Sequence, residues 1–171
     1  MLSKFLPNEH VKSVFAIKPE VLKELGIKGI ITDLDNTLVA WDMKEATPEI
    51  VEWFEQMKEA NIKVTIISNN NQERVKLFSD PIGVPFVYDA RKPLPRAFKQ
   101  AATEMELTKE EIVVIGDQIL TDVLGGNIAG FNTILVVPVV ETDAKITKIN
   151  RKIERIILNY MRKKGKISWE E

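Results

Sequence analysis

The chain has 171 residues, 44% of them hydrophobic, which suits one α/β domain with a real core. It has no cysteine and one histidine, His10, so disulfides, thiolate chemistry, a Ser-His-Asp triad and a multi-histidine zinc site are excluded. The net charge is −1, and carboxylates, hydroxyls, lysines and a hard metal ion remain for chemistry. We expect His10 in an exposed loop. Because the first residues lack the apolar core of a signal peptide, we expect a cytoplasmic protein.

Strand-like and helix-like patterns alternate along the chain. In chain order they predict a strand over 29–33, a helix capped by Thr47 with Pro48 at its first position, a strand over 64–68, a helix around 72–78, a strand over 85–88, a helix over 95–105, a capping turn at 108–111, a strand over 112–115, a helix over 121–129, a strand over 133–137 and a helix over 143–162. Alternation with strands that are apolar on both faces predicts a Rossmann-like three-layer α/β domain with a five-stranded parallel sheet. We expect this domain to span residues 1–142, followed by a basic tail over 143–171.

Polar residues follow each predicted strand. Asp33 and Asp35 end the first, Ser68 and Asn69 end the second, Lys92 comes after the third, and the fourth ends in Asp117 and Asp122. Ligands of such sheets bind beyond the carboxyl ends of the strands, so these side chains are expected to converge. Asp33 and Asp35 stand two residues apart, a spacing that points both side chains of an extended chain to one side.

Each of these residues has an ordinary explanation when it is taken alone. An acid after a strand is commonly a helix cap or a turn former, Ser68 and Asn69 suit a loop, and Lys92 suits a solvated charge. Together they are harder to explain in this way, because several converging carboxylates repel one another unless a cation holds them. Mg²⁺ fits, since it takes oxygen ligands and leaves positions for water and phosphate.

The run Ile-Ile-Thr-Asp-Leu-Asp-Asn-Thr-Leu-Val over 30–39, with Ser68, Lys92 and the Gly-Asp…Asp segment over 116–122 in this order, resembles the haloacid dehalogenase-like (HAD) phosphatase superfamily. Over nearly the whole chain, the DLDNT, SNN, ARKP and GDQ-x-x-TD segments resemble the YqeG branch of its class IIIA phosphatases. That branch is similar to the mitochondrial phosphatidylglycerophosphate phosphatases. The resemblance implies a Mg²⁺-dependent phosphomonoesterase that acts through an aspartyl phosphate.

The resemblance also implies a role for each matching residue. Asp33 would be the nucleophile, and Asp35 would protonate the leaving oxygen and then deprotonate water. The implied phosphate-binding groups are Ser68, the Asn69 backbone N–H and Lys92, and the implied metal ligands are Asp33, the Asp35 carbonyl and Asp117. Asp122 would orient water or Lys92 without binding the metal itself.

The intervals between the motifs bear on the substrate. Neither the one from Asp35 to Ser68 nor the one from Ser68 to Lys92 can hold a folded cap domain, so we expect an open site. An open site suits a phosphate on something large, with phosphatidylglycerophosphate as the favoured substrate. Two alternatives remain: a receiver-like signalling domain that is phosphorylated on aspartate, or a phosphatase of nucleic-acid ends. The second is disfavoured, since no aromatic stacking platform lies among the basic residues.

The C-terminal segment is strongly basic. Residues 144–166 hold nine Lys/Arg and one acid, Glu154. Its apolar residues recur at helical spacing: Ile146, Ile149, Ile153, Ile156, Ile157 and Tyr160. One interpretation is a terminal helix that packs its apolar stripe on the domain. The other is peripheral contact of 144–166 with an anionic membrane, with Trp169 as an interfacial anchor, at the inner face of the membrane. The oligomeric state is not indicated by the sequence.

Overall fold

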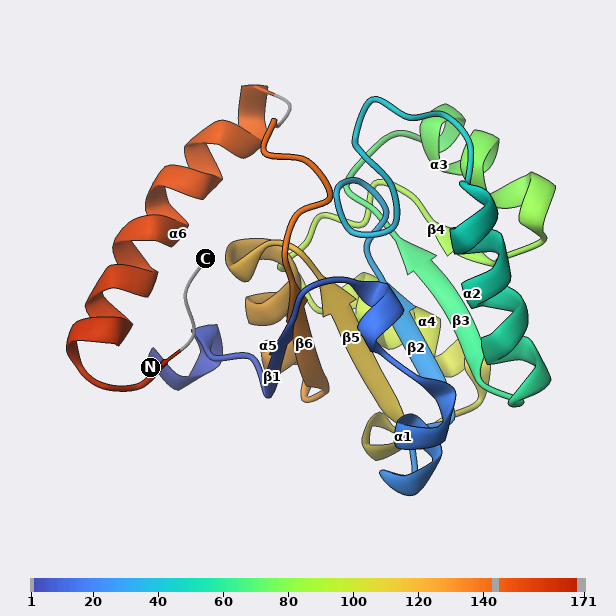
Figure 1. The fold of residues 1–171 in the computed structure, drawn as a ribbon, viewed down its shortest axis with the longest axis horizontal. Coiled ribbons are helices and arrows are strands. Elements are labelled where there is room, and N and C mark those ends of the chain that lie inside the picture. The colour runs from blue at the N-terminus through green and yellow to red at the C-terminus, as the bar shows by residue number, and fades with distance from the viewer. Residues whose placement is uncertain (1, 143–144, 169–171) are drawn as a thin grey trace.

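The fold centres on a parallel β-sheet, as seen in a computed structural model that describes residues 2–142 and 145–168. The strands are β1 (Glu9–Val11), β2 (Gly29–Thr32), β3 (Lys63–Ile67), β4 (Phe86–Val87), β5 (Ile112–Gly116) and β6 (Asn132–Val136). Their order across the sheet is β1-β6-β5-β2-β3-β4, and every pair is parallel (Figure 1). The two central strands, β5 and β2, are buried along their whole length, so their carboxyl ends meet in the middle of one sheet edge.

Helices cover both faces of the sheet. They are α1 (Pro19–Glu24), α2 (Pro48–Glu59), α3 (Gln72–Ser79), α4 (Arg96–Met105), α5 (Leu124–Ala129) and α6 (Lys145–Lys163). Alternate residues of β2 enter different cores, since Ile30 packs with α1, α2 and α3 whereas Ile31 packs with α4. This is the three-layer arrangement predicted from strands that are apolar on both faces. The predicted N-cap is also confirmed, because the Thr47 side chain accepts the Ile50 N–H.

Helix α6 packs beside the β1–β6 side of the sheet (Figure 1). Leu158 and Met161 of α6 form a third apolar cluster with Ile119, Val123 and Leu135. The helix is therefore part of the packed structure over the residues described. Of the helices within 2–142 and 145–168, none is both long enough and apolar enough to span a bilayer. The expected boundary at 142/143 stays a prediction, and Trp169 lies outside the described residues.

The sheet has six strands, and the prediction of five missed β1. This strand has three residues and lies at the sheet edge, where it pairs with Ile134–Val136 of β6. Asn8 fixes the pairing, because its side chain accepts the Thr133 N–H and its own N–H binds the Thr133 carbonyl. His10 consequently lies half-buried in an edge strand, and its expected place in an exposed loop is wrong. A segment this short has no periodicity that could announce it.

Candidate active site

Asp33 directly follows β2 and is buried at the carboxyl edge of the sheet. Its Oδ1 accepts a hydrogen bond from Lys92 Nζ at 2.7 Å. The Thr37 hydroxyl lies 3.2 Å from Asp33 Oδ2 and 3.1 Å from Asp117 Oδ1, so it links the ends of β2 and β5. Because the loop turns back on itself, with the Asn36 N–H bonded to the Val39 carbonyl, Thr37 can reach both acids.

Asp35 lies beside Asp33 but has different partners. Arg74 of α3 donates to Asp35 Oδ1 through Nε at 3.1 Å and Nη2 at 2.9 Å, and the Asn70 amide donates to Oδ2 at 3.0 Å. Burial and the nearby Asp33 raise the pKa of Asp35, against the opposing effect of Asn70 and Arg74. A carboxyl group with a raised pKa and a fixed orientation is suited to proton transfer.

The segment after β3 joins two sides of the site. Ser68 is buried, and its hydroxyl oxygen accepts the Asn70 N–H at 3.0 Å. The Asn69 side chain accepts the Lys92 N–H at 2.7 Å and donates to the Lys92 carbonyl at 3.2 Å. These two hydrogen bonds to the Lys92 backbone hold the loop that carries Lys92. The position of Lys92 therefore depends on the Asn69 side chain, whereas the sequence analysis assigned a role only to the Asn69 backbone N–H.

Lys92 is the buried cation of the site, with 2% of its side chain exposed. Its ammonium group lies 2.7 Å from Asp33 Oδ1 and 2.6 Å from Asp122 Oδ1. Burial lowers the pKa of Lys92, but the carboxylates of Asp122 and Asp33 outweigh burial and raise that pKa above its ordinary value. Lys92 is therefore charged at neutral pH. Its contact with Asp122 is compatible with the expected role of Asp122, which is to orient Lys92.

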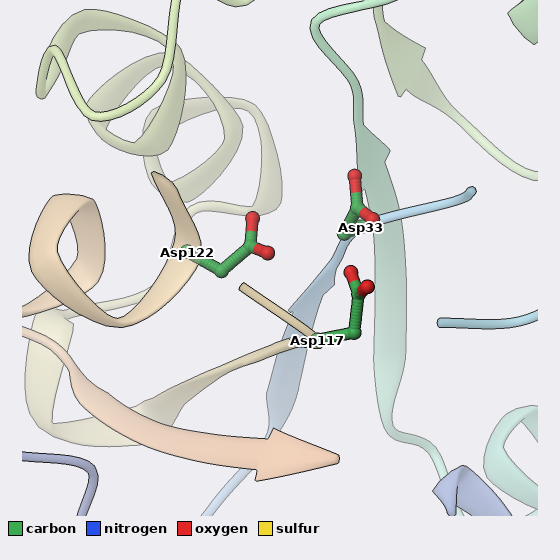
Figure 2. Close-up of side chains that lie close together, drawn as sticks. All are labelled: Asp33, Asp117 and Asp122. Carbon is green, nitrogen blue, oxygen red and sulfur yellow. The ribbon is translucent and has the colours of Figure 1, made fainter. Parts of the chain in front are cut away.

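Three carboxyl groups converge in Figure 2: Asp33, Asp117 and Asp122. One oxygen from each lies within 4.8 Å of the others. Asp122 reaches the cluster from a π-helix over Ile119–Val123, where the sequence predicted the start of an α-helix. Its side chain crosses Gly116, where a Cβ atom would overlap the Asp122 carboxyl group. Glycine is thus required at 116 for this approach.

The charges in this cluster favour a divalent cation. Burial and neighbouring acids raise the pKa of Asp117 and of Asp122, while Arg151 and Lys92 act in the opposite direction. With Glu154, the cluster holds four carboxyl groups around two cationic side chains, so ionisation leaves negative charge in excess. Mg²⁺ takes oxygen ligands and is usually held by one or two carboxylates, with water and phosphate oxygens in its other positions. The residues present therefore fit a magnesium ion.

Helix α6 also contributes to the site. Arg151 donates to the Asp117 carboxylate and, at 2.6 Å, to the Asp117 carbonyl, and its guanidinium lies 3.3 Å from Glu154 Oε2. Glu154 is 4% exposed and accepts the Leu120 N–H at 2.8 Å. Burial raises the pKa of Glu154 to about 7, with the Leu120 N–H and Arg151 acting against it. These contacts fix α6 to Asp117 and to Leu120, within the segment that carries the acids.

The raised pKa of Glu154 predicts a pH-dependent contribution to stability. The folded state holds a proton on Glu154 more tightly than the unfolded state does, so this stabilisation is present below about pH 4.5 and is lost as the pH rises to about 7. Glutamine does not titrate, so the free energy of unfolding of Glu154→Gln lacks this pH dependence. As the pH rises from 4.5 to 8, the free energy of unfolding of Glu154→Gln should therefore increase relative to that of the wild type by on the order of 3 kcal/mol. Urea unfolding at several pH values measures the difference. A difference that is constant with pH would contradict the prediction.

A pocket of about 300 Å³ opens at Asp33 and Asp35. Its lining includes Asp33, Asp35, Ser68, Asn69, Lys92, Trp41, Thr147 and Asn150. The residues between Asp35 and Ser68, and between Ser68 and Lys92, form only loops, single helices and strands. No inserted cap domain lies in these intervals, both of which the structure describes. The expectation of a capless site is met.

The structure brings all the expected residues to one edge of the sheet, although their roles remain predictions. Asp33, Asp35, Ser68, Asn69 and Lys92 line the pocket, and Asp117 and Asp122 are clustered with Asp33. The Asp35 carboxylate is not part of the three-acid cluster, whose third member is Asp122. The sequence analysis missed several side chains that hold the acids: Thr37, Asn70, Arg74, Arg151 and Glu154. Only Thr37 and Asn70, inside the DLDNT and SNN segments, gave a local signal.

Comparisons with known proteins identify the family of the chain. The family model of haloacid dehalogenase-like hydrolase matches residues 17–130. The chain is 63% identical to Probable phosphatase YqeG of Bacillus subtilis (strain 168), over the full length of both. It is 28% identical to phosphatidylglycerophosphate phosphatase 1 of Arabidopsis thaliana, with 94% of this chain and 49% of the plant protein covered. The chain thus spans about half the length of that relative.

A solved structure supports the fold. The cobalt-bound deoxy-D-mannose-octulosonate 8-phosphate phosphatase of Haemophilus influenzae superimposes with a TM-score of 0.57 at 16% identity. The match covers 80% of this chain and 90% of that one. At this identity the likeness concerns the fold.

Proposed function

Since the chain belongs to the haloacid dehalogenase-like hydrolase family and is a phosphatase, we propose that it hydrolyses phosphate monoesters through an aspartyl phosphate on Asp33. One observation carries the proposal. Asp33 and Asp35 line a single pocket together with Lys92, and the buried acids Asp117 and Asp122 are clustered with Asp33. This set offers a nucleophile, a proton donor, a charge for the phosphoryl group and a metal site in one place.

Asp33 and Asp35 divide the chemistry. A carboxylate oxygen of Asp33 attacks phosphorus, the bond to the leaving oxygen breaks, and Asp35 donates its proton to that oxygen. Asp35, now ionised, takes a proton from water, and the water oxygen attacks the phosphorus of the aspartyl phosphate. Inorganic phosphate leaves and Asp33 is regenerated. The raised pKa of Asp35 favours the protonated form that the first step needs.

The surrounding groups bind and orient the phosphate. The Ser68 hydroxyl and the Asn69 N–H are the proposed donors to phosphoryl oxygens, and Lys92 offsets the charge that develops in the transition state. Lys92 also keeps Asp33 in position through its 2.7 Å contact. Asp122 orients Lys92 from the other side. These polar groups are held by the protein before substrate arrives, so little reorganisation is needed.

Mg²⁺ is the proposed cofactor. Asp33, Asp117 and the Asp35 carbonyl are the proposed ligands, with Asp122 next to them. When bound, the ion supplies positive charge that allows an anionic phosphate to approach a carboxylate. Thr37 keeps Asp33 and Asp117 together through its contacts to both carboxyl groups. Arg151 also orients Asp117 through its contacts to the Asp117 carboxylate and carbonyl.

We propose phosphatidylglycerophosphate as the substrate. The capless pocket suits a phosphate displayed on a large molecule, and the plant relative carries this substrate in its name. A lipid substrate also implies peripheral contact with a membrane at its inner face, for which residues 144–166 are the expected surface. The receiver-like alternative is not favoured. The chain matches a hydrolase family, and its candidate nucleophile belongs to the Asp33/Asp35 pair itself.

A substrate panel tests the proposed function. Phosphate release is measured from phosphatidylglycerophosphate in mixed micelles, glycerol 3-phosphate, p-nitrophenyl phosphate, a nucleotide and a 5′-phosphorylated oligonucleotide. We expect the highest kcat/KM with the lipid. Chelation of divalent metal should lower the activity at least about 100-fold, and millimolar Mg²⁺ should restore it. Metal-independent turnover would contradict the cofactor assignment, and preference for the oligonucleotide would contradict the lipid substrate.

A further inference from the structure

Helix α6 leaves an apolar stripe exposed on its outer face. The stripe consists of Ile149, Ile153, Ile156 and Tyr160, which are 63%, 44%, 69% and 46% exposed. The helix packs on the domain through other residues, among them Glu154, Leu158 and Met161. The spacing of four, three and four residues places the stripe along one line of the helix. Packing on the domain thus leaves these four side chains exposed.

Exposed basic residues adjoin the stripe along the same helix. They are Lys152, one turn from Ile149 and Ile156, and Lys163, one turn from Tyr160, with the Lys164 ammonium over the Tyr160 ring. Glu154, the acid of residues 145–163, is turned inward against Leu120 and Arg151. The outer face therefore combines apolar side chains with positive charge and no exposed carboxylate among its described residues. A helix of this composition suits the interface of an anionic bilayer, where long basic side chains reach the headgroups.

The alternative occupant, a second copy of this chain, is electrostatically disfavoured. Two such faces would bring like charges together at the rim of a small contact. An anionic lipid surface instead attracts each basic residue by about 1 kcal/mol. The charge pattern therefore favours the lipid surface.

The stripe begins at the end of α6 that borders the active site. Ile149 precedes Asn150, which lines the pocket together with Thr147. Figure 1 shows α6 on the outside of the molecule, beside the β1–β6 side of the sheet. Arg151 and Glu154 fix this same part of the helix to Asp117 and Leu120. A surface that meets Ile149 would therefore lie near the pocket.

We propose that the face formed by the stripe and its adjoining lysines docks the protein on an anionic phospholipid surface. Docking places the open pocket next to the headgroups. The inference deepens the proposed function, because it supplies the contact by which the site reaches a lipid phosphate. It concerns binding alone, so it can hold or fail independently of turnover.

Vesicle sedimentation of the full chain tests the proposal. We expect binding to vesicles of phosphatidylglycerol and phosphatidylcholine, and at least about tenfold weaker binding to phosphatidylcholine alone. The double variant Ile153→Glu/Ile156→Glu should bind the anionic vesicles at least about tenfold more weakly than the wild type. The control variant Val21→Glu/Leu25→Glu replaces two residues of similar exposure on the α1 side, 52% and 62% exposed, and should bind as the wild type does.

Further measurements separate the possible outcomes. Hydrolysis of soluble p-nitrophenyl phosphate should be the same for both double variants and the wild type, which shows that they fold. Equal vesicle binding by the stripe variant and the wild type would overturn the proposal. So would a dimer in sedimentation velocity that the stripe variant abolishes, because the face would then join two copies. A wild type that binds vesicles but hydrolyses no phosphate ester would leave the docking face in place and remove the proposed function.

Discussion

Asp33→Asn lowers the rate of phosphate release at least about 10³-fold, because an amide cannot attack phosphorus and no covalent intermediate forms. The fold should persist, since Lys92 keeps its 2.6 Å contact with Asp122 and the apolar cores are unchanged. Turnover of p-nitrophenyl phosphate and the circular dichroism spectrum measure the two effects. Mass spectrometry after an acid quench tests the intermediate directly, with a phosphoryl group on Asp33 expected in the wild type and no phosphoryl group at position 33 in Asp33→Asn.

Asp35→Asn provides the contrasting variant. Loss of a proton donor costs about 10²–10⁴-fold, but p-nitrophenolate leaves without protonation, so the first step should survive with this substrate. The second step lacks its base, and the phosphorylated Asp33 should accumulate. With glycerol 3-phosphate, whose leaving oxygen needs the proton, both steps should fail.

Asp42→Asn, which changes an exposed carboxylate in the loop after the site, serves as the control and should retain full activity. Undiminished turnover by Asp33→Asn would refute the nucleophile assignment. A phosphorylated Asp33 that persists in the wild type would instead favour the signalling alternative, since a hydrolase intermediate is short-lived.

Local patterns predicted most of the fold. The central strands were found because both of their faces are buried, and α2 was found because Thr47 and Pro48 mark its start. The strand β1 was missed because three residues at a sheet edge are held by pairing with β6, which is 121 or more residues away. Local sequence cannot reveal such a contact.

The candidate site was predicted in its acids but not in the residues that hold them. Asp33 and Asp117 were found because they end strands, and the ends of parallel strands converge. Arg74 and Arg151 look like ordinary solvated charges on helices, and only the packing of α3 and α6 brings them to the acids. The apolar stripe of α6 was correctly identified as helical. The face of α6 that packs on the domain could not be predicted, however, because it depends on the surface of the domain that the helix meets.

Lys92→Met should destabilise the folded protein by about 3–5 kcal/mol, the cost of removing one partner from a buried ion pair. Lys92 lies within 2.7 Å of Asp33 and within 2.6 Å of Asp122, and all three side chains are at least nine-tenths buried. Methionine preserves the volume but leaves three acids within 4.8 Å of one another with less positive charge. Urea unfolding at pH 7 without divalent metal measures the loss. Phosphatase activity should fall as well, since the proposed charge at the phosphoryl group is gone.

Millimolar Mg²⁺ should restore part of this lost stability, because a cation among the same acids replaces some of the missing charge. The melting temperature of Lys92→Met should therefore rise with Mg²⁺ more than that of the wild type does. Lys28→Met is the matched control: its pair with Glu111 has 63% of the lysine side chain exposed, so the change should cost less than about 1 kcal/mol, and its melting temperature should respond to Mg²⁺ as that of the wild type does. If Mg²⁺ left the stability of Lys92→Met unchanged, the three acids would not be the metal site, and the electrostatic basis of the proposed hydrolysis would fail with it.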